Sequence, residues 1–129
     1  MHAPMNPPRL VALDDDPASA ELIVQLAERS GYEAKALTGS DGLADLVVNW
    51  RPDVITLDLA MPEVNGFGAL TLLNVMAYGG TLVIISGTPA HFRATAKEHA
   101  IASGLRVAAE MQKPVDGKAF RALLESLKA

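Results

Sequence analysis

The 129-residue chain contains no cysteine. This absence excludes a disulfide framework, a thiol nucleophile and a cysteine-ligated zinc site, and it favours the cytoplasm, where disulfides are rare. Histidine is scarce as well, and His2, His91 and His99 have no metal-binding spacing with one another or with the aspartates. The sequence therefore offers no ligand set for zinc.

Long hydrophobic runs and clusters of basic residues are also missing. The longest aliphatic run covers only residues 82–85, far short of the roughly 18 apolar residues that a membrane span needs. The net charge is −4, from 11 basic and 15 acidic residues, whereas nucleic-acid binding needs clustered lysine and arginine. We therefore expect no membrane partner and no direct binding of nucleic acid.

The first eight residues include three prolines and lack the charged start and apolar centre of a signal peptide. We expect residues 1–8 to form a flexible N-terminal arm. The remaining residues, 9–129, are enough for one domain with a single hydrophobic core.

What the sequence does contain is carboxylates placed directly after apolar runs. Asp14, Asp15 and Asp16 follow the run at 9–13, and Asp58 follows the run at 54–57. Short aliphatic runs of this kind are typical of strands that are buried on both faces of a parallel sheet. Capping of the next helix explains Asp16 alone, because one oxygen suffices for a cap.

Apolar runs alternate with helical periodicities along the whole chain. The runs predict five strands, at 9–13, 32–37, 54–57, 81–86 and 105–111, with a helix after each of them. The helix expected at 90–103 has a weak apolar stripe of Phe92, Ala96 and Ala100, and the one expected at 43–50 ends at Trp50. The alternation predicts an α/β fold of three layers, a doubly wound (βα)5 arrangement with a five-stranded parallel sheet.

Parallel strands bring their carboxyl ends to one edge of a sheet, where ligands bind in open α/β folds. That edge would hold Asp14, Asp15 and Asp58, with Ser86 and Lys113 at the ends of the fourth and fifth strands. Three carboxylates repel one another unless a cation lies among them, and Mg²⁺ prefers such oxygen ligands. Phosphoryl transfer needs a nucleophile, a cation and further hydrogen-bond donors. Asp58 suits the role of nucleophile, Mg²⁺ and Lys113 would supply positive charge, and the Ser86 hydroxyl would be a further donor.

These segments resemble the receiver domains of two-component response regulators, the fold of the bacterial chemotaxis regulator, from Arg9 onward. Leu-Val-Ala-Leu-Asp-Asp-Asp-Pro at 10–17 is similar to the family's acidic pair, and 53–62 with Gly66 is similar to its phosphoacceptor segment. Ile-Ile-Ser-Gly at 84–87 resembles the family's hydroxyl signature. Lys113-Pro114 resembles its lysine, which a cis peptide bond often follows.

The resemblance implies a flavodoxin-like strand order, 2-1-3-4-5, and a phosphoacceptor role for Asp58, with Lys113 and Ser86 as its catalytic partners. It also implies that Asp14, Asp15, Asp58 and the Ala60 carbonyl bind Mg²⁺, with Asp15 as a direct ligand.

The resemblance further implies a phosphoryl donor, either a sensor histidine kinase or a phosphotransfer protein. An output domain, a downstream protein and a homodimer are open as further partners. The chain would be a signalling domain that catalyses only its own phosphorylation and dephosphorylation, and it would not be an enzyme in the wider sense. Phosphorylation would shift an equilibrium in which the helix at 90–103 moves.

One position departs from the family pattern. Three residues before the lysine, members of the family usually carry an aromatic residue. That aromatic side chain commonly rotates behind the hydroxyl residue on phosphorylation, whereas this chain has Glu110 at the position. Because a charged side chain prefers solvent over burial, we expect Glu110 to be solvated and the signalling surface to differ from the usual one.

Three other functions stay open at this point. A receiver-like interaction module that is not phosphorylated is favoured by Glu110 and disfavoured by the acidic pocket. A haloacid-dehalogenase-type phosphohydrolase would use the aspartates at 14–16, but it needs an acidic pair after the lysine, where Asp116 and Glu125 stand alone. A flavodoxin-like flavin binder needs hydroxyls and glycines in the first loop, where three aspartates would repel a phosphate.

Overall fold

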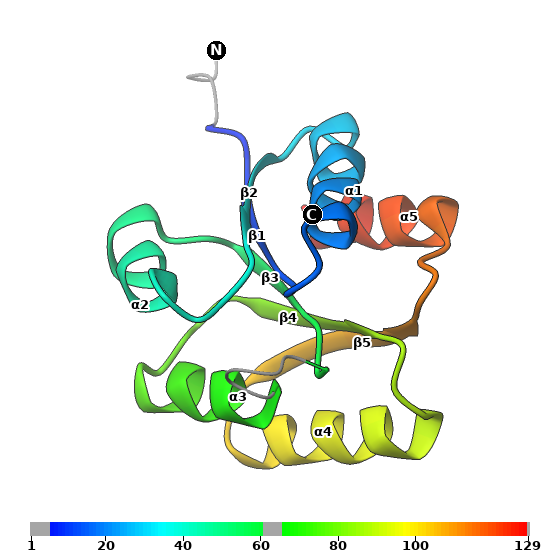
Figure 1. The fold of residues 1–129 in the computed structure, drawn as a ribbon. Coiled ribbons are helices and arrows are strands. Elements are labelled where there is room, and N and C mark those ends of the chain that lie inside the picture. Colours follow the sequence, from blue (N-terminus) through cyan, green and yellow to red (C-terminus); the bar gives the residue numbers. More distant parts are fainter. Residues whose placement is uncertain (1–5, 61–65, 129) are drawn as a thin grey trace.

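The computed structural model describes residues 6–60 and 66–128 (Figure 1). Most of the expected N-terminal arm, and residues 61–65 of the phosphoacceptor-like segment, lie outside the described residues. The strands are β1 (Arg9–Leu13), β2 (Glu33–Leu37), β3 (Val54–Leu57), β4 (Thr81–Ser86) and β5 (Arg106–Gln112). The helices are α1 (Pro17–Arg29), α2 (Leu43–Asp45), α3 (Gly66–Val75), α4 (Ala90–Ala102) and α5 (Gly117–Leu127).

The five strands form one parallel sheet in the order β2-β1-β3-β4-β5. Helices α1 and α5 lie on one face of the sheet, and α3 and α4 lie on the other (Figure 1). This arrangement confirms the predicted three-layer α/β fold and its strand order. None of the helices in the described part of the chain has the length and apolarity of a membrane span.

Strand side chains alternate between two cores because successive residues of a strand point to opposite faces. In β1, Leu10 and Ala12 belong to the core with α1 and α5, whereas Val11 and Leu13 belong to the core with α2, α3 and α4. Phe120 of α5 is fully buried in the first of these cores. The sheet is therefore covered on both faces, and its strand ends are left as the place for polar chemistry.

Two helices begin at aspartates, as their sequences predict. Asp16 accepts a hydrogen bond from the Ala18 N–H (3.1 Å), and Pro17 occupies the first helical position of α1. Asp116 accepts one from the Ala119 N–H (3.1 Å) at the start of α5. Asp16 is thus used by helix capping, and Asp14 and Asp15 are left for another role.

The helix expected at 43–50 is only partly α-helical. Helix α2 ends at Asp45, and the chain continues as a π-helical turn, Leu46–Trp50, that closes with a hydrogen bond from the Arg51 N–H to the Leu46 carbonyl (2.9 Å). Arg51 has a φ of 56° and precedes Pro52, and proline disfavours the α conformation in the residue before it. The helix therefore ends in a wide turn.

The single tryptophan lies against Arg9, the first residue of β1, and Lys35, in the middle of β2. The Trp50 ring lies 4.8 Å from the Lys35 ammonium and 5.4 Å from the Arg9 guanidinium, and the Arg9 side chain also donates to the Trp50 carbonyl (2.8 Å). Both cations are within the distance at which an aromatic ring attracts them. Trp50 is thereby fixed against the start of β1.

Candidate functional site

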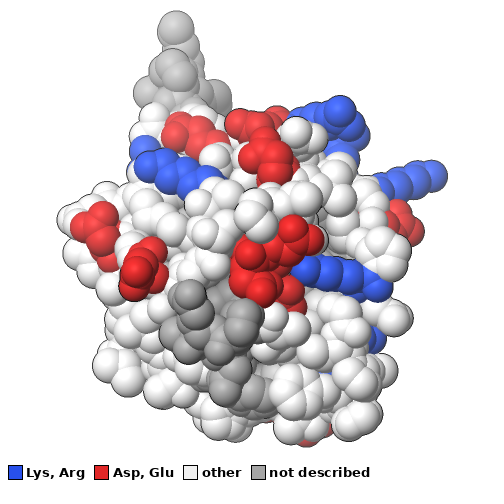
Figure 2. Space-filling model, in the orientation of Figure 1, with Lys and Arg blue, Asp and Glu red and all other residues white. Residues whose placement is uncertain are grey.

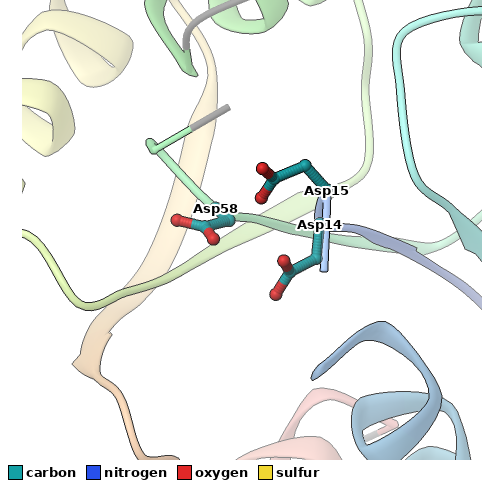
Figure 3. Close-up of side chains that lie close together, drawn as sticks. All are labelled: Asp14, Asp15 and Asp58. Carbon is teal, nitrogen blue, oxygen red and sulfur yellow. The ribbon is translucent and has the colours of Figure 1, made fainter. Parts of the chain in front are cut away.

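Strand register places Asp14 and Asp58 side by side. Leu13 of β1 pairs with Leu57 of β3, and the Asp58 N–H donates to the Leu13 carbonyl (3.0 Å). Asp14 and Asp58 therefore leave two neighbouring strands at the same level. Carboxylate oxygens of Asp14, Asp15 and Asp58 lie within 4.8 Å of one another, and Figure 3 shows the three side chains gathered at these strand ends.

The register of β4 with β5 brings the lysine to the same edge. Ser86 pairs with Gln112, and the Lys113 N–H donates to the Ser86 carbonyl (3.1 Å). The peptide bond between Lys113 and Pro114 is cis. The Lys113 ammonium lies 2.6 Å from Asp14 Oδ2 and 2.9 Å from Asp58 Oδ2. Figure 2 shows acidic side chains gathered near the middle of this face, next to a basic one.

Asp58 is the most fully coordinated of the three acids. It is 5 % exposed, it accepts hydrogen bonds from the Lys113 ammonium and from the Ala60 N–H (3.0 Å to Oδ1), and the nearby Ser86 hydroxyl is a third donor that favours its charged form. Burial alone would raise the pKa of Asp58, but these three donors outweigh it and lower the pKa below its ordinary value. Asp58 is therefore held as a carboxylate, the form that acts as a nucleophile.

The remaining groups show that the site is short of positive charge. Burial raises the pKa of Asp14, and its hydrogen bonds from Lys113 and from the Asp16 N–H do not fully offset this. Burial would lower the pKa of Lys113, but its hydrogen bonds to Asp14 and Asp58 raise it. Asp14 and Asp58 thus share one ammonium group, and Asp15, the most exposed of the three acids, adds a third carboxylate to the cluster.

This donor set fits a divalent cation with a preference for oxygen. Mg²⁺ is commonly bound by one or two carboxylates, with water and phosphate oxygens completing an octahedron. The more exposed Asp15 leaves the cluster open to solvent on one side, which such an ion needs in order to keep part of its water. The described residues also include no histidine in this cluster that would favour zinc.

A family model for the response regulator receiver domain matches residues 10–125. The chain belongs to this family. The match includes the whole acidic cluster and, apart from Arg9, all five strands, so the site described above lies within the receiver domain.

Known proteins resemble this receiver domain over different lengths. A response regulator from Colwellia psychrerythraea superposes with a TM-score of 0.80 and 26% identity, covering 95% of this chain and 97% of that one. The DNA-binding dual master transcriptional regulator RpaA of Synechocystis is 44% identical over 61 residues, 46% of this chain and 25% of the relative. Protein PilH of Pseudomonas aeruginosa is 33% identical over 78 residues, 60% of this chain and 64% of the relative. The aligned stretches thus span less than two thirds of these curated relatives.

The receiver domain brings together every side chain that the sequence singles out for the site. Asp14, Asp15, Asp58, Ser86 and Lys113 all lie at the carboxyl edge of the sheet, joined by the contacts given above. Ala60 lies two residues after Asp58 and donates its N–H to the Asp58 carboxylate. The metal contact of the Ala60 carbonyl and the catalytic and metal-binding roles of the other residues stay predictions.

Glu110 is only partly solvated, and the expectation that the signalling surface differs from the usual one stays a prediction. Its side chain is 28 % exposed and forms an ion pair with Arg93 of α4, in which Arg93 Nε lies 2.8 Å from Glu110 Oε2. Arg93 was assigned no role from the sequence, yet it is 6 % exposed, whereas Phe92, expected in the buried stripe of this helix, is 37 % exposed. The spacing of Arg93 with Ala96 and Ala100, three and seven residues, is the signal that would have placed it on the buried face.

Proposed function

We propose that this receiver domain accepts a phosphoryl group on Asp58 from a phosphohistidine of a sensor histidine kinase or phosphotransfer protein, with Mg²⁺ bound. The observation that supports the proposal most is the state of Asp58, a buried carboxylate whose pKa is lowered beside a lysine, a hydroxyl and two further acids. Few other functions require a buried acid to stay ionised in this setting.

In the proposed reaction an Asp58 oxygen attacks phosphorus, the bond from phosphorus to the histidine nitrogen breaks, and the imidazole leaves with its electron pair. The Lys113 ammonium, already 2.9 Å from Asp58, would move its contact to a phosphoryl oxygen, and the Ser86 hydroxyl would donate to another. Mg²⁺, held by Asp14, Asp15, Asp58 and the Ala60 carbonyl, would supply the positive charge that the site lacks.

Hydrolysis of the aspartyl phosphate by water would return Asp58 to its carboxylate, so the domain acts as a switch and has no other substrate. The modified surface would be recognised by an output domain, a downstream protein or a second copy of the chain, in the cytoplasm. RpaA is described as DNA-binding, but this chain's own composition does not favour direct DNA contact.

The decisive experiment is intact mass after incubation with acetyl phosphate, with Mg²⁺ or with a chelator. The wild-type chain should gain the mass of one phosphoryl group only when Mg²⁺ is present, and Asp58→Asn should gain none. Asp41→Asn, a matched change of an exposed acid outside the cluster, should be labelled like the wild type. Equal labelling of Asp58→Asn would rule out Asp58 as the acceptor.

The alternative of an interaction module that is not phosphorylated is favoured by one observation, the ion-paired Glu110 at the position of the usual aromatic residue. A wild-type chain that gains no mass under these conditions would support that alternative. Sustained release of phosphate from small phosphate esters would instead support a haloacid-dehalogenase-type hydrolase.

A further inference from the structure

A buried cation lies outside the acidic cluster, in helix α4. The Arg93 side chain is 7 % exposed, and its Nε donates to Glu110 of β5 at 2.8 Å. Its Nη1 donates to the carbonyl oxygen of Thr88, in the loop between β4 and α4. Arg93 therefore ties together three separate parts of the chain, namely a loop, a helix and an edge strand.

Thr88 connects this ion pair to the acidic cluster. Its N–H donates to Ser86 Oγ (3.3 Å), while its carbonyl accepts from Arg93. The Ser86 hydroxyl also helps to lower the pKa of Asp58, so it lies in the surroundings of that carboxylate. A series of hydrogen bonds thus runs from Ser86, beside Asp58, through Thr88 to Arg93 and Glu110.

One polar atom of the loop that carries Thr88 lacks a hydrogen-bond partner in this arrangement. The Thr88 hydroxyl oxygen is buried and has no hydrogen-bond partner among the described residues. A buried polar atom without a partner is costly, and such atoms are uncommon in folded proteins. A second arrangement of the loop that satisfies this hydroxyl would therefore compete with the one observed.

We propose that the Arg93–Glu110 pair is a latch that holds the loop in its unphosphorylated arrangement and that phosphorylation of Asp58 works against it. The inference rests on the proposed phosphorylation. A phosphoryl group on Asp58 adds oxygens beside the Ser86 hydroxyl, which already helps to lower the pKa of the Asp58 carboxylate. Ser86 then changes its partner, Thr88 follows, and the contact of the Thr88 carbonyl with Arg93 breaks.

The choice of residues supports a switching role over a stabilising one. Burying the Arg93 guanidinium and partly burying Glu110 costs desolvation free energy, and apolar residues of similar size in place of a buried ion pair often leave the fold as stable or more stable. An ion pair that adds little stability but fixes one arrangement suits an element with two states. The latch would thus occupy the position where the family usually has its aromatic residue.

Thermodynamic reciprocity supplies the test, because a latch that opposes the phosphoryl group must weaken binding of a phosphoryl mimic. The probe is beryllium trifluoride at saturating Mg²⁺, measured by calorimetry on the whole chain. Arg93→Met/Glu110→Leu removes both charges at once, so that no unpaired buried charge is left to unfold the protein. Glu125→Leu/Lys128→Met removes an exposed ion pair of α5 and is the matched control.

We expect the Arg93→Met/Glu110→Leu chain to bind beryllium trifluoride about five- to tenfold more tightly than the wild type, a coupling of ordinary size. Amide hydrogen exchange at residues 87–93 should be about fivefold faster in this variant without ligand, and the ligand should then add little further change. In the wild type, the ligand itself should speed exchange of this segment. The control pair should match the wild type in both measurements.

Unchanged or weaker affinity in the variant would overturn the latch, and so would unchanged exchange at residues 87–93. If the wild type is labelled by acetyl phosphate while the variant's affinity is unchanged, the latch alone is wrong. If the wild type neither takes up phosphoryl groups nor binds beryllium trifluoride, the proposed function fails and the latch fails with it.

Discussion

Binding of Mg²⁺ should stabilise this receiver domain, and the acidic cluster sets the size of the effect. Carboxylate oxygens of three aspartates lie within 4.8 Å of one another. At an effective dielectric constant of about 20, two unit charges at that distance repel by about 3.5 kcal/mol. Lys113 offsets only part of this repulsion, so a bound divalent cation has a large share left to neutralise.

The expected shift follows from mass action. At a Mg²⁺ concentration 100-fold above the dissociation constant, binding stabilises the folded state by about 2.7 kcal/mol. For a chain of 129 residues the unfolding entropy is about 270 cal/mol/K, so the thermal midpoint should rise by about 10 °C. Thermal unfolding followed by circular dichroism, from chelator to saturating Mg²⁺, measures this rise.

The variant Asp15→Asn distinguishes the repulsion among the carboxylates from the binding of Mg²⁺, because the two effects change stability in opposite directions. Without Mg²⁺ this variant should be more stable than the wild type by about 1 kcal/mol, because one partly solvated charge leaves the cluster. With Mg²⁺ it should gain far less than the wild type, because one ligand is lost. Glu28→Gln, the same change at the exposed far end of α1, is the control. A wild-type midpoint that ignores Mg²⁺, or an equal gain in Asp15→Asn, would refute the reasoning.

Three further outcomes are expected. Lys113→Met should slow labelling by acetyl phosphate about 100-fold, because a directed donor to the transferring group is lost. The control Lys118→Met changes an exposed lysine and should leave the labelling rate unchanged. Equal rates in the two variants would exclude Lys113 from the chemistry. Burial raises the pKa values of both tyrosines, Tyr32 and Tyr78, so their neutral forms stabilise the fold fully below pH 10, and this stability is lost as pH rises through the raised values. An absorbance titration should therefore show that the tyrosines ionise only above pH 10 and that the protein unfolds as they do so. Ionisation of both tyrosines near pH 10 while the protein stays folded would contradict this. Phe120→Ala should lower the free energy of unfolding by about 3 to 5 kcal/mol because it leaves a cavity in the core with α1 and α5, as chemical denaturation would show; a loss below about 1 kcal/mol would contradict that packing.

The fold could be predicted from the sequence because its signals are local. Each apolar run matches the pleated period of a buried strand, and Asp16 and Asp116 mark helix starts through hydrogen bonds to their own neighbours. The gathering of Asp58 and Lys113 could also be predicted, because parallel strands send their carboxyl ends to one edge. Their distances could not, because these depend on strand register.

Interactions between distant segments were beyond the sequence. A charged residue on a helix is ordinarily solvated, so the helical spacing of Arg93 with Ala96 and Ala100 was the one local sign of its burial, and its partners on the preceding loop and on β5 could not be predicted. Glu110 was expected in solvent for the same reason. The π-helical turn at Leu46–Trp50 likewise depends on how the chain must enter β3 after Pro52.

The position of Trp50 also determines what intrinsic fluorescence can report. The indole lies against Arg9 at the amino end of β1 and against Lys35 in the middle of β2, whereas Asp58 follows the carboxyl end of β3. Four steps of about 3.3 Å, about 13 Å in all, separate Arg9 from Leu13 at the two ends of β1. Tryptophan emission should therefore follow global unfolding and stay silent when a metal ion or phosphoryl group arrives at the opposite edge. A fluorescent reporter of signalling would have to be introduced beside Thr88.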